Sequence, residues 1–270
     1  MGKIVLDNVS RAFGSGSRNG HEVLALDSVS LHISDQEIVC LVGPSGCGKS
    51  TLVNLIAGFD APSRGDVLVG GAHVRQAGPD RMVVFQTPAL FPWMTVIDNI
   101  VFGPRKRGVP LGQCVDDAAR YMHAMGLDGF GHHFPYQLSG GMRQRVQIAS
   151  ALVNRPDVLL MDEPFVALDF QTRLGMQELL LQIWDEFHPT ILFITHDVEE
   201  AVFLADRLYV MTKRPGRIKE EITVPFPKPR TFDIVTIPAF VAIKEHVLQL
   251  IRHELNAPAN HTGTLGRIPS

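Results

Sequence analysis

The chain has 270 residues, of which 45% are hydrophobic and 20% charged, a composition typical of folded globular proteins. The formal net charge of −3 and an isoelectric point near 6.4 argue against a general electrostatic grip on nucleic acid. Three cysteines form no C-x-x-C pair, so we expect reduced thiols rather than a disulfide scaffold. We expect neither a targeting segment nor a membrane span, because the apolar runs are shorter than the ~18–20 residues that a spanning helix needs.

The first part of the chain predicts mostly strands. Apolar patterning and turn residues indicate a polar turn at 14–20 and strands at 4–9, 23–33, 37–42, 66–69 and 82–85. The third of these strands leads into a glycine-rich stretch. A helix then follows from Lys49 to about Ala57, where Gly58 ends it.

The pattern changes to helical between residues 87 and 154. Thr95, with Asp98 three residues later, matches a capping box that opens a helix. Apolar side chains recur at helical spacing through 114–125, and another helix is expected after Ser139. This stretch therefore predicts a helical insert.

Strands and helices alternate again after the insert. We expect helices at 170–187 and 197–204, and strands at 158–161, 190–194, 207–211 and 218–224. A stiff proline-rich exit at 225–229, a closing helix around 241–252 and a loose tail should follow. Asp197 with Glu200 resembles a further helix cap. The alternation predicts an α/β fold. We divide the chain into a core with a β subdomain (1–86 and 155–235), a helical subdomain (87–154) and a C-terminal helix with a loose tail (236–270).

A phosphate-binding loop is the first motif with chemistry. The pattern G-x-x-x-x-G-K-S is matched by Gly43, Pro44, Ser45, Gly46, Cys47, Gly48, Lys49, Ser50 and Thr51. The glycines let backbone N–H groups point at an anion, and the following helix adds its positive dipole end. Lys49 would reach the β- and γ-phosphates, and Ser50 would place its hydroxyl on Mg²⁺. The alternative is a chance glycine-rich turn. Cys47 is interpreted first as a passive loop residue; as a further hypothesis, the helix N-terminus lowers the pKa of its thiol.

Two acids end the strand at 158–161. Asp162 is suited to hold Mg²⁺, and Glu163, one residue later, points elsewhere and is suited to polarise an attacking water. The alternative is a buried strand that ends in solvated acids.

The segment 138–145 predicts a second anion-binding helix end. Ser139 is placed to cap a helix, and Gly140 and Gly141 leave its first N–H groups bare. Two such ends in one chain make sense if the second faces the nucleotide of a neighbouring copy.

From residue 3 to about 230 the chain resembles an ATP-binding-cassette (ABC) ATPase, because four more elements follow in that family's order. The resemblance implies that Phe13 stacks on adenine and that Gln86 touches Mg²⁺ or the water. It also implies that Asp169, in Ala167-Leu168-Asp169, links two cassettes, and that His196 contacts the γ-phosphate. Taken singly, these residues also fit a core aromatic, a polar strand end, a helix cap and a capped-turn histidine.

The resemblance implies a P-loop NTPase with a RecA-like core, an N-terminal antiparallel β subdomain and a helical insert. It implies ATP and Mg²⁺ as ligands, bound between 43–51 of one chain and 139–142 of another. The implied catalytic residues are Glu163, His196, Lys49 and Gln86, and the metal-binding residues Ser50, Gln86 and Asp162. The implied nucleotide contacts beyond the phosphate loop are Phe13, Gln86, Ser139, Gly140, Gly141, Met142 and Asp169.

Finer features resemble the ATP-binding subunits of nitrate, sulfonate and taurine importers. They lie at 90–99, 164–169, 195–201 and 214–218, with Val166 where that group often has glycine. This implies a second ATPase subunit, either an identical copy or a different chain, together with a transmembrane permease and an extracytoplasmic solute-binding protein. It also implies a peripheral place on the cytoplasmic face of the inner membrane and no nucleic-acid partner. The segment 91–93 would line a groove for the permease, or Trp93 would lie in the core.

Other function classes stay open as alternatives. An exporter ATPase subunit is one, although many exporters fuse the cassette to membrane helices. A soluble ABC ATPase acting on ribosomes or DNA is another, although such proteins usually carry two cassettes or a long coiled-coil insertion.

Overall fold

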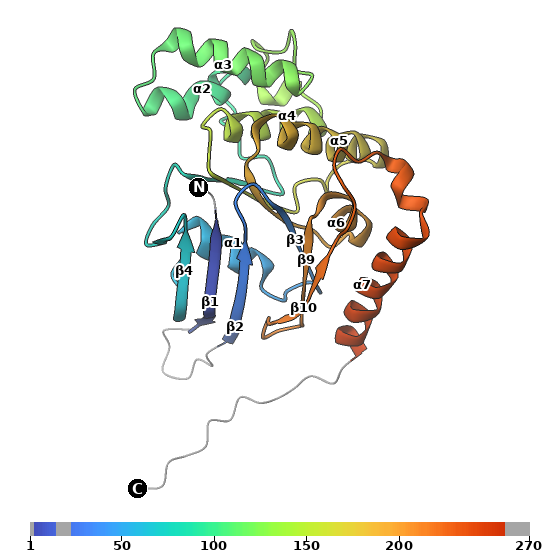
Figure 1. The fold of residues 1–270 in the computed structure, drawn as a ribbon. Helices are drawn as coiled ribbons and strands as arrows, with labels where there is room; N and C mark the ends of the chain where they lie inside the picture. Colours follow the sequence, from blue (N-terminus) through green and yellow to red (C-terminus); the bar gives the residue numbers. More distant parts are fainter. Residues whose placement is uncertain (1–2, 15–22, 257–270) are drawn as a thin grey trace, which may run out of the picture.

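A six-stranded sheet runs through the centre of the molecule. The computed structural model describes residues 3–14 and 23–256, and Figure 1 shows the arrangement. The strand order is β10-β9-β3-β8-β7-β6, with all neighbours parallel except β10. Their bounds are β3 Ile38–Val42, β6 Arg81–Val84, β7 Val158–Asp162, β8 Thr190–Ile194, β9 Arg207–Met211 and β10 Ile218–Thr223.

A second, antiparallel sheet has the order β2-β1-β4-β5, which confirms the predicted β subdomain. Its strands are β1 Ile4–Phe13, β2 Val23–Ile33, β4 Arg64–Val69 and β5 Ala72–His73. β1 continues past Val9, where we expected it to end, because register shifts after Leu6 let it bend and keep pairing. Most of the predicted polar turn at 14–20 lies outside the described residues.

Seven helices occur in the described ranges, and α2 and α3 lie at the top of Figure 1, beyond one end of the sheets. They are α1 Lys49–Ala57, α2 Val96–Lys106, α3 Leu111–Ala124, α4 Gly140–Leu152, α5 Phe170–Phe187, α6 Val198–Leu204 and α7 Pro238–Asn256. Short 3₁₀ turns occupy Pro135–Gln137 and Phe232–Thr236. None of the helices in the described ranges is long and apolar enough to cross a membrane.

Alternate residues of the central strands supply two separate cores. In β3, Cys40 points to the core shared with α4, α5, α6 and α7, whereas Leu41 points to the core shared with α1 and the antiparallel sheet. In β8, Phe193 and Ile194 divide in the same way. Both faces of the sheet are therefore covered, which explains why its strands read as continuous apolar runs.

Helix α7 is confirmed, but its buried face differs from the stripe at 241, 245, 248 and 252 that predicted it. Phe240 and Val247 are buried instead, and the Phe240 ring stacks on Phe226 at 5.9 Å between centroids. The proline-rich exit brings Phe226 to this position, and this contact is not visible in the helical periodicity.

Candidate functional site

The predicted site residues follow the carboxyl ends of neighbouring parallel strands. The phosphate loop follows β3, Asp162 ends β7 and Glu163 comes next, His196 follows β8, and Gln86 follows β6. Carboxyl ends of parallel strands meet at one edge of a sheet, which is where α/β proteins bind ligands. The topology therefore brings these segments to one side of the molecule.

The phosphate loop curls around the ammonium group of Lys49. This side chain is buried, and its Nζ donates hydrogen bonds to the carbonyl oxygens of Gly43 (3.0 Å) and Pro44 (3.2 Å). Gly48 has φ 105°, a conformation that favours glycine, and within the described residues no side chain caps α1. The first N–H groups of α1 are thus left for an anion.

Glycines let the loop lie directly against its neighbours. A Cβ on Gly48 would lie 2.6 Å from Cδ2 of Leu26 in β2, and a Cβ on Gly43 would lie 3.0 Å from Cβ of Met211 in β9. The loop is therefore held from behind by both sheets.

The turn after β9 supplies a further support that the sequence did not assign. A Cβ on Gly216 would overlap the carbonyl oxygen of Cys47. The Gly216 N–H donates to the Ala25 carbonyl (2.9 Å), and the Gly216 carbonyl accepts from the Asp27 N–H (3.0 Å). Gly216 belongs to the segment 214–218, which now has a structural role: it braces the phosphate loop against β2.

The hypothesis of a lowered Cys47 pKa is wrong. Cys47 is completely buried, and this burial raises the pKa of its thiol above the ordinary value, although the charge of Lys49 acts in the opposite direction. Desolvation disfavours the thiolate more than the helix end and Lys49 favour it. Cys47 is therefore a packed loop residue.

Asp162 and Ser50 are paired at the loop. Burial raises the pKa of the Asp162 carboxyl, the charge of Glu163 raises it to a smaller extent, and the neighbouring Ser50 hydroxyl acts in the opposite direction. No group of three or more His, Cys, Asp or Glu suited to a metal occurs in the described parts of the chain. A hydroxyl and one carboxylate nevertheless fit Mg²⁺, which prefers oxygen ligands and takes the rest from phosphates and water.

Glu163 and His196 are brought together across 33 residues of sequence. The Nδ1 atom of His196 lies 3.1 Å from Oε2 of Glu163. Glu163 has φ 48°, an uncommon conformation for a residue other than glycine, and its N–H donates to the Ile194 carbonyl at 2.9 Å. Such a backbone costs about 1–3 kcal/mol and is often kept at functional sites.

Asp169 caps a helix, as its simpler interpretation predicts. Its carboxylate accepts hydrogen bonds from the N–H (3.0 Å) and the hydroxyl (2.7 Å) of Thr172, and the first of these is the main cause of its lowered pKa. Asp169 is also exposed, so capping α5 leaves its outer side accessible.

The start of α4 is an exposed turn. Ser139 caps the helix by accepting a hydrogen bond from the Met142 N–H at 3.2 Å, as expected. Both Ser139 and Gly140 are exposed, whereas a Cβ on Gly141 would lie 2.8 Å from Cγ2 of Thr172. The start of α4 therefore packs against the start of α5 through Gly141, while its capping residue Ser139 is exposed.

Gln86 and Phe13 lie at exposed strand ends. Gln144 of α4 donates a long hydrogen bond (3.4 Å) to the carbonyl of Phe85, next to Gln86. The Phe13 ring is 44% exposed, which excludes the core alternative, and the guanidinium of Arg11 covers one face at 4.7 Å.

An aromatic surface lies between the sheet edge and α2. Trp93 is 71% exposed, so it is not a core residue, and the Phe91 ring lies 5.7 Å from Trp93 and 4.7 Å from Phe102 between centroids. The buried Asn99 side chain, whose role the sequence did not show, bonds to the Phe91 N–H (2.8 Å) and the Met94 carbonyl (3.1 Å). Beside this turn, a cavity of about 430 Å³ is lined by Met94, Asp98, Phe102, Arg105 and Lys106.

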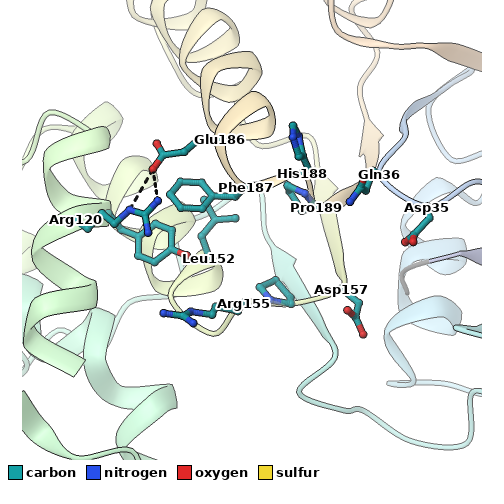
Figure 2. A pocket seen from close by; sticks show the side chains of 12 residues that line it. Asp35, Gln36, Arg120, Leu152, Arg155, Asp157, Glu186, Phe187, His188 and Pro189 are labelled. Atoms are coloured by element: carbon teal, nitrogen blue, oxygen red, sulfur yellow. Dashed lines mark hydrogen bonds and ion pairs between the residues drawn. The ribbon is translucent and has the colours of Figure 1, made fainter. Parts of the chain in front are cut away.

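A second cavity, of about 630 Å³, lies at the amino ends of the parallel strands (Figure 2). An ion pair between Arg120 of α3 and Glu186 of α5 (2.6 Å) stands at one end of it, and Asp35 lies at the other. It lies at the sheet edge opposite to the phosphate loop. Its size alone therefore does not make it the nucleotide site.

Residues 26–166 match the family model described as ABC transporter. The chain belongs to the ABC transporter family. The matched part runs from β2 past the phosphate loop, the α4 segment and Glu163, whereas Phe13, Asp169 and His196 lie outside it.

Relatives of this ABC protein align over most of its length. It is 44% identical to an uncharacterized ABC transporter ATP-binding protein of Methanocaldococcus jannaschii, over 94% of this chain and 92% of the relative. It is 48% identical to a nitrate import ATP-binding protein of Synechocystis sp. (85% and 89%) and 48% identical to a taurine import ATP-binding protein of Chromobacterium violaceum (83% and 88%).

The fold matches solved ABC cassettes. One is a dimeric ATP-binding cassette in a post-hydrolysis state with ADP and Pi, with a TM-score of 0.72 and 30% identity over 83% of this chain and all of that one. The P-loop fold is thus confirmed, and this ABC protein is an ATPase that binds ATP.

Proposed function

We propose that this ABC ATPase powers the import of a small anionic solute, such as nitrate, a sulfonate or taurine, through a separate permease. The observation that carries the hydrolytic part is the Glu163–His196 contact of 3.1 Å, formed at the sheet edge that also carries the phosphate loop and Asp162. The nitrate and taurine import proteins among the relatives support the solute class.

Hydrolysis then follows from the placement of the side chains. Lys49 and the N–H groups of the phosphate loop hold the β- and γ-phosphates and neutralise charge that develops on them. Glu163 orients the attacking water and accepts its proton, which contributes a factor of about 10²–10⁴ to the rate. His196 bonds to the γ-phosphate and, through its contact with Glu163, keeps that carboxylate in position.

A bound Mg²⁺ would supply positive charge that offsets the negative charge of the phosphates. The Ser50 hydroxyl and the Asp162 carboxylate would hold it or its waters, since their oxygens are already adjacent. Gln86, exposed after the end of β6, would complete this set.

Two chains would clasp ATP head to tail. The exposed Ser139 and Gly140 would offer the N–H groups of α4 and a serine hydroxyl to the γ-phosphate bound by the other chain. The segment 139–142 and Asp169 would lie at this interface, with Phe13 against the adenine. The dimeric cassette among the structural neighbours supports this arrangement.

The aromatic surface would receive a short helix of the permease. Trp93 and Phe102 offer apolar area beside the 430 Å³ cavity, with Asp98 and the cations Arg105 and Lys106 at its wall. An exposed apolar patch next to a cavity is typical of a protein-binding site. The ATPase would thus sit on the cytoplasmic face of the inner membrane, and an extracytoplasmic protein would deliver the solute.

Purification from native membranes tests this proposal. The tagged chain should co-isolate a permease and a solute-binding protein, and a binding assay on the latter should give nitrate, a sulfonate or taurine as ligand. Trp93→Ala should reduce the recovered permease, whereas Leu255→Ala should not, because Leu255 is similarly exposed (63%) at the far end of α7. Recovery of the wild-type chain without a permease, or with ribosomes or DNA, would reject the importer.

A further inference from the structure

Arg173 lies between two loops of the site, although no motif singled it out. Its Nη2 donates a hydrogen bond to the Leu168 carbonyl at 3.1 Å, and its Nη1 lies 3.6 Å from Oδ2 of Asp197. Leu168 belongs to the 167–169 loop, which would link two chains, and Asp197 directly follows His196. Arg173, Glu163 and His196 also line one small cavity.

Both partners of the guanidinium are firmly held. The Asp197 carboxylate caps α6 by accepting hydrogen bonds from the N–H groups of Glu199 (3.0 Å) and Glu200 (3.2 Å). The Arg173 N–H donates to the Asp169 carbonyl at 2.9 Å, which fixes the start of α5 under the 167–169 loop. A displacement of that loop would therefore be passed through the arginine to the turn that carries His196.

The start of α4 packs against the 167–169 loop and the first turn of α5. A Cβ on Gly141 would lie 2.8 Å from Cγ2 of Thr172, the residue before Arg173, and 3.8 Å from Cδ2 of Leu168. The exposed helix end that would hold the partner chain's nucleotide is thus packed against the turn that bears Arg173.

The position of the Arg173 side chain leaves one of its hydrogen-bond donors unsatisfied. Its Nε is buried and has no hydrogen-bond partner among the described residues. An unsatisfied buried donor is unfavourable, and a long flexible side chain in the first turn of a helix could otherwise turn to solvent. The contacts of Nη2 with the Leu168 carbonyl and of Nη1 with the Asp197 carboxylate therefore hold the guanidinium between these two loops.

We propose that Arg173 is a positioning residue that couples the 167–169 loop and the start of α4 to His196. The inference rests on the proposed roles of Glu163 and His196. When a second chain presses on the loop, the planar guanidinium transmits the displacement of the Leu168 carbonyl to the Asp197 carboxylate, which keeps the His196 ring in its contact with Glu163.

The first test compares arginine variants of the full chain. Arg173→Ala should lower kcat about ten- to hundredfold, because small misplacements of catalytic groups have effects of this size, while ATP affinity stays within about twofold. Arg173→Lys keeps the charge and most of the packing but lacks the planar fork, so it should also lower kcat at an unchanged melting temperature. Arg107→Ala is the control, because Arg107 also donates to a main-chain carbonyl (Asn154, 3.2 Å) but lies at the end of α2. Unchanged kcat in both Arg173 variants would overturn the inference.

A double-variant cycle separates positioning from a general loss of stability. In single-turnover measurements with labelled ATP, Arg173→Ala should have no further effect on a His196→Ala background, because Arg173 acts through that ring. Effects that multiply would overturn the inference. If His196→Ala alone leaves the rate unchanged, the proposed catalytic site fails instead, and the Arg173 single variants still show separately whether that residue matters.

Discussion

The two helix ends that would bind phosphate are built in opposite ways. The start of α1 is supported from behind by Gly216, Leu26 and Met211, and Lys49 is buried within its loop. The start of α4 is exposed at Ser139 and Gly140, and the nearest atom to a Cβ on Gly140 is a guanidinium nitrogen 4.0 Å away. One end is braced by the two sheets behind it, and the other is an outward surface.

This difference indicates that the starts of α1 and α4 have different roles in nucleotide binding. A loop whose backbone N–H groups are held in place from behind binds an anion at a small ordering cost. A surface turn with one capped N–H offers fewer contacts, so it needs an anion that is already held by another chain. We therefore expect changes near α1 to affect nucleotide affinity and changes near α4 to affect dimer formation.

The largest effect should come from Glu163→Gln, which removes the base but leaves both helix ends intact. We expect kcat to fall about 10²–10⁴-fold while ATP still binds and holds two chains together. Single-turnover hydrolysis and size-exclusion chromatography with ATP would measure both. Turnover at the wild-type rate would show that Glu163 is not the base.

The next largest effect should come from Gly216→Ala, which breaks the support of the α1 end. The new methyl group would overlap the Cys47 carbonyl, and such overpacking costs about 1–3 kcal/mol. We expect ATP affinity to fall about five- to hundredfold in titrations with a fluorescent ATP analogue. Gly112→Ala in α3 is the control, since a Cβ there meets no described atom within 4 Å. Equal affinities for the two variants would contradict the bracing role.

Ser139→Ala should weaken the proposed contact between the start of α4 and the nucleotide of the partner chain. Loss of the bond to the Met142 N–H costs about 0.5–2 kcal/mol, and the hydroxyl offered to the partner's nucleotide is lost as well. We expect weaker ATP-dependent dimers in the Glu163→Gln background and unchanged ATP affinity of the single chain, both measured by analytical ultracentrifugation with labelled ATP.

Thr95→Ala provides the matched control for this comparison. Thr95 caps α2 by accepting from the Asp98 N–H at 3.3 Å, so the same kind of bond is lost away from the proposed interface. A similar loss of dimer in both variants would show that helix stability, rather than contact with the partner, explains the result.

The smallest effect concerns the thiol inside the α1 loop. Because burial raises the pKa of Cys47, its thiolate fraction is small at neutral pH and should rise about tenfold for each pH unit up to that pKa. Maleimide labelling followed by mass spectrometry at pH 7, 8 and 9 would measure this. A labelling rate that is already at its plateau at pH 7 would indicate a lowered pKa and a more open loop.

The local motifs were predictable because neighbouring residues encode them. The phosphate loop, the caps at Thr95 and Ser139 and the paired acids at 162–163 depend on spacings of a few residues, which the sequence displays directly. Alternation of apolar strands and helices was enough to predict the α/β class. The two-residue strand β5 was not predicted, since two exposed residues carry no periodic signal.

Turn chemistry and apolar periodicity are local properties, so the sequence alone predicted the phosphate loop, the paired acids and the order of the main strands and helices, without the short strand β5. The folded molecule was needed to show the brace at Gly216, the bridge made by Arg173, the positive φ of Glu163 and the direction of the Cys47 pKa shift. Each of these depends on groups that folding brings into contact, or removes from water, and no spacing along the chain records such contacts.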